Sequence, residues 1–312
     1  MASLRSAAIG DERYSGFRIS PIAFRLDGSD CELDLCSSYP PSAMRYPIRL
    51  AVQIHPQQSS YAAMRDAAVE AEERGADVVF NWDHFYPLYD DPDGAHFECW
   101  TQLASFAEVT SRVEIGALVT CNSYRNPNLL ADMARTVDHI SGGRVILGIG
   151  SGWFERDYDE YGYEFGTAPD RLRALRRDLP TIERRLARLR PPPIRDMPIL
   201  IGGGGEKVTL RITAEHADIW HGFGDAGTIA HKRTVLEAHC ATVGRDPGDI
   251  EISAGVPRDR RGEIARGEAL VEAGATLLTF GLGGPVFDLS FLDTWVEWRD
   301  EKNRGPAKPG RR

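Results

Sequence analysis

The amino-acid sequence predicts a closed (β/α)₈ barrel, and three observations support this fold class. From about Ile48 onward, short β-rich runs alternate with amphipathic helical runs. Eight such strand–helix units follow one another, which is the number that closes an α/β barrel. Most strand runs are nearly continuous apolar stretches, as expected for parallel strands buried on both faces. The alternative left open by this pattern is an open, doubly wound sheet.

The expected strands are rich in β-branched and other apolar residues and end at polar or glycine-containing segments. They span residues 48–54, 77–82, 113–120, 145–150, 199–202, 218–222, 250–255 and 276–281. The expected helices follow them at 61–74, 98–111, 128–140, 170–189, 207–215, 228–243, 262–272 and 290–302. Gly75 and Gly274 lie just past two of these helices, where a left-handed residue commonly ends a helix.

The barrel accounts for residues 44–304 of the 312. Residues 1–43 show no clear period and contain Pro40 and Pro41, so we expect a poorly ordered N-terminal extension. Residues 305–312 form a C-terminal tail. The length suits a single barrel of the roughly 250-residue class.

Composition excludes several classes of partner. The net charge of −9 argues against nucleic acid and against anionic membrane surfaces. No apolar run approaches the roughly 20 residues of a membrane span. Five scattered cysteines without a CxxC pair indicate reduced thiols and hence a cytoplasmic protein. A small-molecule substrate is the expected partner.

An Asp-His pair ends the second expected strand, where barrel enzymes place their catalytic groups. Asp83 and His84 lie between the aromatic residues Trp82 and Phe85. An imidazole there supplies a proton carrier of near-neutral pKa beside an apolar wall. The alternative is that Asp83 caps the next loop and His84 packs on Phe85.

Two glycine-rich segments end later strands. Gly148, Gly150 and Gly152 alternate before Trp153, so the backbone can approach a flat or anionic group on which the indole stacks. A tight barrel-corner turn is the alternative. Downstream, an acidic and aromatic loop is expected to line a pocket, with a solvated surface as the alternative; it contains Glu155, Asp157, Tyr158 and Tyr161.

The second segment, Gly202, Gly203, Gly204 and Gly205, follows a strand and directly precedes the expected helix 207–215. Free backbone N–H groups before a helix can bind a phosphate. It lacks the spacing of a Walker A loop. A flexible connector is the alternative.

Hydrolytic metal chemistry is a competing function for a barrel, but the required ligands are not evident. His84 has no H-x-H partner at the first strand, and His55 is alone before Pro56. His221 follows the sixth strand without a neighbouring carboxylate. We therefore expect no metal site. No G-x-S-x-G nucleophile motif is present either.

Four runs together resemble the luciferase-like monooxygenase superfamily, in particular its branch of oxidoreductases that use the deazaflavin coenzyme F420. They span residues 83–85, 116–127, 138–155 and 198–207. The resemblance covers about residues 46–300. It implies a (β/α)₈ barrel with the cofactor ring at the carboxyl ends of the strands.

The resemblance also implies site roles. Asp83 and His84 would lie at the ring, with His84 near the reacting carbon as proton donor or substrate orienter. A bulge with a non-prolyl cis peptide, near Leu118 and Val119, would lie behind the ring, and the glycines would bind the cofactor phosphate. The full set of implied cofactor contacts is Leu118, Val119, Thr120, Gly150, Ser151, Gly152, Trp153, Gly202, Gly203, Gly204 and Gly205.

Two features depart from this pattern. Trp153 stands where sugar-phosphate dehydrogenases of the F420 branch carry a Glu. About thirty residues of a pocket-lining insertion are missing, because residue 189 leads almost directly through Pro191, Pro192 and Pro193 to the fifth strand.

The expected function is hydride transfer between C5 of F420 and a small organic substrate. The alternatives are an FMN-dependent monooxygenase and a non-catalytic protein that binds F420 or flavin. The sequence itself does not specify the oligomeric state; the resemblance implies a homodimer, because family members are commonly dimers.

Overall fold

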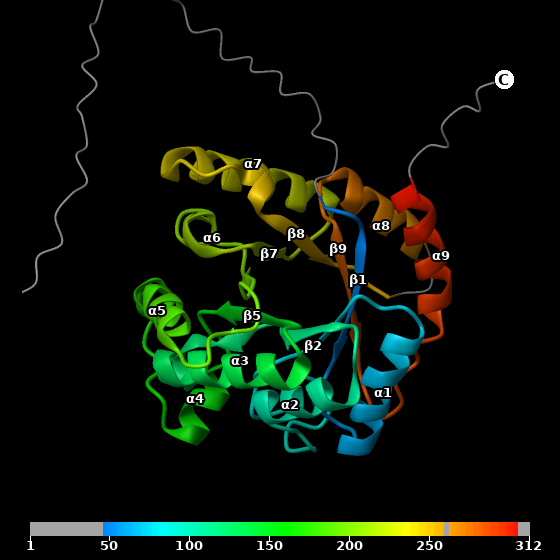
Figure 1. Cartoon of the computed structure of the whole chain (residues 1–312), viewed down its shortest axis with the longest axis horizontal. Helices are drawn as coiled ribbons and strands as arrows, with labels where there is room; N and C mark the ends of the chain where they lie inside the picture. The colour runs from blue at the N-terminus through cyan, green and yellow to red at the C-terminus, as the bar shows by residue number, and fades with distance from the viewer. Residues whose placement is uncertain (1–45, 259–261, 305–312) are drawn as a thin grey trace, which may run out of the picture. The chain divides into compact units, whose positions relative to one another are not determined.

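The computed structural model describes residues 46–258 and 262–304, and in them it contains a closed barrel of parallel strands (Figure 1). The strand order is β3-β2-β1-β9-β8-β7-β6-β5-β4, and an additional β3–β5 pairing closes the ring. This confirms the predicted (β/α)₈ barrel and excludes the open sheet. The predicted extension 1–43 and tail 305–312 lie outside the described residues. The strands are β1 (Arg49–Ile54), β2 (Val78–Asn81), β3 (Glu114–Ala117), β4 (Thr120–Cys121), β5 (Val145–Gly150), β6 (Ile199–Gly202), β7 (Ile219–Gly222), β8 (Glu251–Gly255) and β9 (Leu277–Leu282).

Helices surround the strands, and each of the eight expected helices is present (Figure 1). One further helix, Glu155–Tyr161, replaces the loop expected at 155–161, so that expectation was wrong. Seven residues are too few to show a helical period, although Gly162 ends the helix in the left-handed region at φ 69°. The helices are α1 (Tyr61–Glu73), α2 (Cys99–Val109), α3 (Pro127–Ser141), α4 (Glu155–Tyr161), α5 (Ala168–Arg188), α6 (Thr209–His216), α7 (Ala226–Val243), α8 (Glu263–Glu272) and α9 (Phe291–Arg304), with 3₁₀ turns η1 (Asn122–Tyr124) and η2 (Pro247–Asp249).

The third strand of the barrel is interrupted. The sequence predicted one strand over 113–120, but the structure divides it into β3 and β4. Between them lies a cis peptide bond that joins Leu118 to Val119. The non-prolyl cis peptide implied by the family resemblance is therefore confirmed.

The interruption accounts for glycines on the neighbouring strands. A Cβ atom on Gly148 would lie 1.9 Å from the carbonyl oxygen of Ala117. Cβ atoms on Gly150 and Gly202 would lie 2.8 and 2.9 Å from methyl groups of Val119. These three glycines thus leave room inside the barrel for the segment around Val119, a protein contact that the sequence did not indicate.

Side chains form two layers around the strands. An inner cluster fills the barrel with one or two side chains from most strands, among them Phe80, Ile146 and Leu200. Larger clusters fill the space between strands and helices. At the amino ends of the strands, Arg49 pairs with Glu114 and Glu251. These ion pairs join β1, β3 and β8 at the amino end of the barrel.

We expect Gly148→Ala to lower the free energy of unfolding by about 2–3 kcal/mol, because the new methyl group meets backbone that cannot move aside cheaply. Gly255→Ala is the matched control, since no atom lies within 4 Å of its Cβ position. Urea unfolding of both variants measures the difference. Equal stability of the two variants would show that the barrel accommodates the clash.

Candidate functional site

A hollow of about 360 Å³ opens at the carboxyl ends of the strands. Its walls come from the ends of β1, β7, β8 and β9 and from the interrupted third strand. Catalytic groups of α/β barrels project from this end. The lining residues are Gln53, Leu118, His221, Gly222, Phe223, Gly224, Gly255, Val256, Pro257, Thr279 and Gly281.

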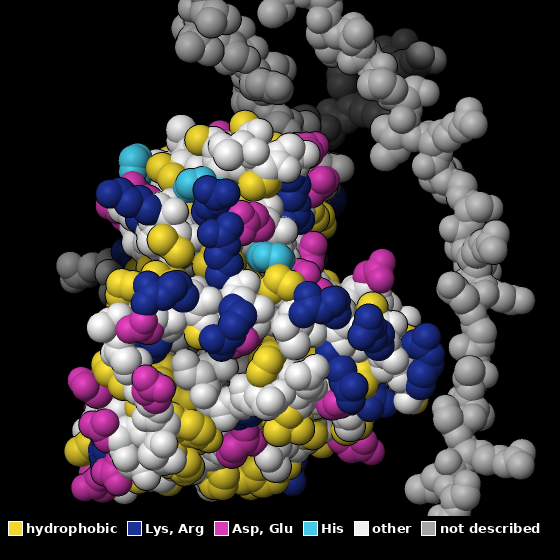
Figure 2. All heavy atoms as spheres, turned by 90° about the vertical axis from the view of Figure 1, so that its left-hand side faces the viewer, with side chains coloured by type: hydrophobic (Ala, Val, Ile, Leu, Met, Phe, Trp, Pro, Cys, Tyr) yellow, Lys and Arg dark blue, Asp and Glu magenta, His cyan; other side chains and the backbone are white. Residues whose placement is uncertain are grey.

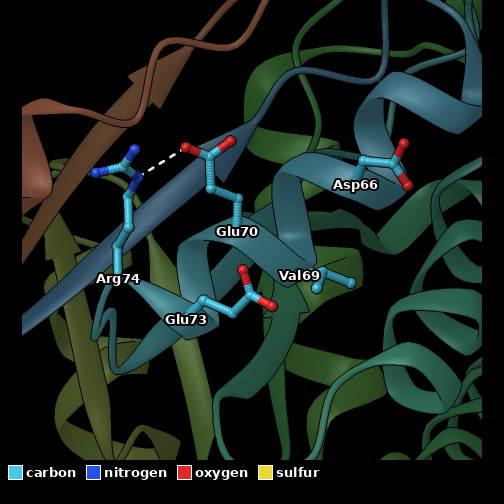
Figure 3. Close-up of a pocket in the computed structure, with 5 residues that line it drawn as sticks. All are labelled: Asp66, Val69, Glu70, Glu73 and Arg74. Atoms are coloured by element: carbon cyan, nitrogen blue, oxygen red, sulfur yellow. Dashed lines mark hydrogen bonds and ion pairs between the residues drawn. The ribbon is translucent and has the colours of Figure 1, made fainter.

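A larger hollow, of about 500 Å³, lies on the outside of helix α1 (Figure 3). Its walls come from this single helix, and Arg74 donates from Nε to Glu70 Oε1 at 2.7 Å within it. The last turn of α1 precedes β2 and therefore lies at the amino end of the strands. The hollow on α1 is the larger of the two, but it lies away from the carboxyl ends of the strands. The smaller hollow is therefore the better candidate for the functional site.

His84 is held by a buried carboxylate on α4. Its Nδ1 lies 2.8 Å from Oδ2 of Asp157, which is fully buried. Asp157 also accepts hydrogen bonds from the backbone N–H groups of Phe85 and Tyr86 and from the hydroxyl of Tyr124. A carboxylate that accepts from Nδ1–H leaves Nε2 free to accept a proton. His84 is 13% exposed, so Nε2 remains reachable.

Asp83, in contrast, is buried and forms a forked ion pair. Arg125 donates to its two oxygens at 2.6 and 3.0 Å, and the backbone N–H of Cys121 donates at 3.0 Å. Burial raises the pKa of Asp83, and the attraction to Arg125 opposes that shift. The two Arg125 hydrogen bonds and the Cys121 N–H satisfy the carboxylate oxygens, which favours the charged form of the pair. This geometry favours a positioning role for Asp83.

Trp82 forms a wall with two neutral histidines. The ring of His55 stacks on the indole of Trp82, with centroids 4.1 Å apart. The indole Nε1–H of Trp82 donates to Nε2 of His96 at 3.2 Å. Burial lowers the pKa of both His55 and His96 to about 4. Both imidazoles are therefore uncharged at neutral pH.

Two aromatic side chains stand exposed at the strand ends. Trp153, after β5, is 63% exposed, and Phe223, after β7, is 62% exposed. Trp153 and the adjacent Phe154 meet the edge of His84, with ring centroids 5.7 and 5.4 Å away. The structure thus brings together the predicted residues His84 and Trp153, whereas Phe223 contacts His221, with ring centroids 5.0 Å apart.

The glycine loop after β6 offers backbone donors. Within the described residues, the N–H groups of Gly204, Gly205 and Glu206 have no protein acceptor, whereas that of Gly203 donates to the carbonyl of His221. Helix α6 begins at Thr209 rather than directly after the glycines, so its predicted start was two residues early. The free donors suit a phosphate group.

Helix α7 brings basic side chains to this loop. Lys232 donates to the carbonyl of Gly204 at 2.6 Å and lies 3.2 Å from Glu206. His231 and His239 also contact Glu206. Figure 2 shows Lys and Arg side chains, with histidines among them, on the face of the molecule that lies at the left of Figure 1, where α5 and α6 are found.

Three other predicted cofactor contacts, Thr120, Ser151 and Gly152, are buried or only partly exposed. Thr120 pairs in register with Ile149, whose side chain lies in the layer between strands and helices, so the side chain of Thr120 shares that layer. Gly152 adopts φ 82°, and a Cβ atom there would meet the hydroxyl of Tyr158 at 2.0 Å. Ser151, between Gly150 and Gly152 in the sequence, is partly exposed.

Sequence reasoning gave no role to three residues of this site, namely Arg125, Phe223 and Lys232, and it assigned Asp157 only to a pocket-lining loop, without its contact to His84. Asp157 and Arg125 were within segments that the sequence analysis singled out, yet their partners lie 73 and 42 positions away. Only the packing of different βα units brings such groups together. An aromatic residue directly after an expected strand, as at Phe223, was a usable signal, although its exposure is known only from the structure.

Within residues 46–258 and 262–304, no group of three or more His, Cys, Asp or Glu side chains is arranged to hold a metal ion. No helix in the same residues is long and apolar enough to cross a membrane.

A model of the family described as luciferase-like monooxygenase matches residues 43–258. The chain belongs to the luciferase-like monooxygenase family. Among curated relatives, the F420-dependent glucose-6-phosphate dehydrogenase of Amycolatopsis mediterranei is 37% identical over 117 residues, covering 37% of this chain and 34% of the relative. That of Kineococcus radiotolerans is 36% identical over 107 residues, covering 34% and 32%. The chain thus matches about a third of the length of these relatives.

Solved structures of this luciferase-like fold are similar at low identity. An F420-dependent secondary alcohol dehydrogenase in complex with an F420-acetone adduct gives a TM-score of 0.69 at 17% identity, covering 81% of this chain and 98% of that one. The F420-dependent tetrahydromethanopterin reductase of Methanopyrus kandleri gives 0.66 at 17%, covering 80% and 97%. A type II Baeyer-Villiger monooxygenase from Pseudomonas putida in complex with FMN gives 0.55 at 16%, covering 67% of each chain.

We expect acid to destabilise the Trp82 wall. The pKa of folded His96, about 4, lies below the ordinary 6.5, so between these values the unfolded chain binds a proton that the folded chain does not. The stability supplied by neutral His96 is complete above pH 6.5 and is lost as the pH falls toward 4. In His96→Gln the amide oxygen can still accept from Trp82. As the pH falls over this interval, the free energy of unfolding of this variant should decrease by about 1–3 kcal/mol less than that of wild type.

Unfolding by urea at pH 7 and pH 4.5 measures this difference, in which the shared carboxylate contributions cancel. His231→Gln is the control, since its imidazole is 63% exposed. Parallel loss of stability in wild type and His96→Gln would contradict the prediction.

Proposed function

We propose that this protein is an F420-dependent oxidoreductase that transfers a hydride between the deazaflavin and a small organic substrate. The observation that carries the proposal is that free N–H donors at Gly204 and Gly205 and a carboxylate-held imidazole, His84, both lie at the carboxyl ends of the barrel strands. Donors of this kind fit the cofactor phosphate. The relatives named as F420-dependent support F420 over FMN.

When bound, F420 would supply the hydride acceptor or donor at C5 of its ring. The protein residues would orient the reactants and handle the proton. His84 is the proposed acid or base, because Asp157 fixes Nδ1 and leaves Nε2 for the substrate oxygen. Trp153 and Phe223 would cover the flat faces of the reactants and exclude water. Asp83 would position the segment that carries His84.

A side-by-side titration with F420 and FMN tests the cofactor. We expect F420 to bind and FMN to bind at least tenfold more weakly, and we expect inorganic phosphate to compete with F420 because both would use the glycine-loop donors. Fluorescence of the deazaflavin and absorbance of the flavin report binding. Binding of FMN alone would favour the monooxygenase alternative, and binding of neither would reject the proposal.

His84→Gln should lower turnover by about 10²–10⁴-fold while leaving the dissociation constant for F420 unchanged, since general acid–base catalysis contributes on that order. Asp157→Asn should lower turnover about tenfold or more, because the imidazole loses its orienting carboxylate. The assay uses whichever alcohol or ketone of a panel wild type converts.

Tyr161→Phe is the matched control, since it keeps the ring that stacks on Phe85 at 4.0 Å. Full turnover by His84→Gln would remove His84 from the chemistry. Tight F420 binding with no turnover on any substrate would instead support the non-catalytic alternative.

A further inference from the structure

A second imidazole faces the hollow from the far side of the barrel, where no role has been assigned. His221 ends β7 and is 4% exposed, and it lines the hollow with Gln53 of β1 and Thr279 of β9. The remaining wall near it is apolar, with Leu118 and Phe223. A polar group in such a setting needs a partner, from the protein or from a ligand.

Two hydroxyl groups form a hydrogen-bonded row that reaches Nδ1 of the imidazole. Nδ1 of His221 lies 2.9 Å from Oγ of Ser253, its register neighbour on β8. Oγ of Ser253 lies 3.3 Å from Oγ1 of Thr279. Nε2 of His221 has no hydrogen-bond partner among the described residues, and it is not sealed from solvent either.

The donor and acceptor in each of these two hydrogen bonds follow from counting the available protons. If Thr279 donates to Ser253 and Ser253 donates to Nδ1 of His221, every hydroxyl proton has an acceptor and the imidazole proton is on Nε2. The reverse direction leaves the hydroxyl proton of Thr279 without an acceptor among the described residues. Burial lowers the pKa of His221 to about 4, so this tautomer is uncharged at neutral pH.

We propose that Nε2–H of His221 donates a hydrogen bond to an uncharged carbonyl or hydroxyl oxygen of a ligand in the hollow. This inference rests on the proposed function only for the identity of that ligand. Two sources present the same chemistry, namely a ring carbonyl of the cofactor and the reacting oxygen of the substrate. A donor in an apolar cavity discriminates strongly for such an oxygen, because an unpaired donor there is unfavourable.

The test measures two dissociation constants for wild type and for His221→Phe, one for F420 and one for cyclohexanone as the uncharged carbonyl probe. Titration calorimetry and ligand-detected NMR need no turnover. We expect the variant to bind one of the two about tenfold more weakly. His221→Gln, which keeps a donor, should recover part of the loss, and His139→Phe, at an exposed position of α3 away from the strand ends, should change neither constant.

Weaker binding of F420 assigns the oxygen to the cofactor, and weaker binding of cyclohexanone assigns it to the substrate. If neither constant changes, the inference is overturned. Should wild type not bind F420 at all, the proposed function fails, while the cyclohexanone titration still decides the role of His221. If His221→Phe does not fold, Ser253→Ala replaces it, since losing the donor to Nδ1 should weaken the same binding several-fold.

Discussion

The ion pair between Asp83 and Arg125 is the interaction on which the arrangement of the strand ends depends. Asp83 follows β2, Arg125 precedes α3, and the same carboxylate accepts from the N–H of Cys121 in β4. One buried group thus fixes the end of β2 to the interrupted third strand. Loss of one partner from such a pair typically costs about 3–5 kcal/mol, because a charge is left buried alone. His84 is the next residue, so its position follows from this pair.

The interruption at Leu118 and Val119 imposes the second constraint. Backbone that enters the barrel occupies volume, and neighbouring strands can admit it only where side chains are missing. Gly148, Gly150 and Gly202 meet that requirement. The glycines before Trp153 were interpreted from sequence as an approach site for a flat group. In the structure, Gly148 and Gly150 are required instead by the close approach of Ala117 and Val119. A cofactor contact at Gly150 remains a prediction.

The periodic elements were predictable from sequence, and the pairings across them were not. Eight apolar runs separated by amphipathic helices determine a barrel, since each feature is local. The glycine loop and the Asp-His pair were also visible because strand ends locate them. The contact of His84 with Asp157 depends on α4, which is too short for its period to be detected. That of His221 with Ser253 depends on strand register, which no local pattern gives.

The two histidines at the opening differ in their partners, and this difference separates their chemistry. A carboxylate beside His84 can stabilise the imidazolium, so this side chain is able to carry a proton through a reaction cycle. Among the described residues, Nδ1 of His221 contacts the hydroxyl group of Ser253, and burial opposes protonation of the imidazole, so the proposed role of His221 is that of a fixed dipole. His84 follows β2 and His221 ends β7, so the proposed proton carrier and the proposed permanent donor lie at the same end of the barrel, on opposite sides of the strand order. Such an opening suits the interconversion of a hydroxyl and a carbonyl group, in which a hydride and a proton leave or enter together.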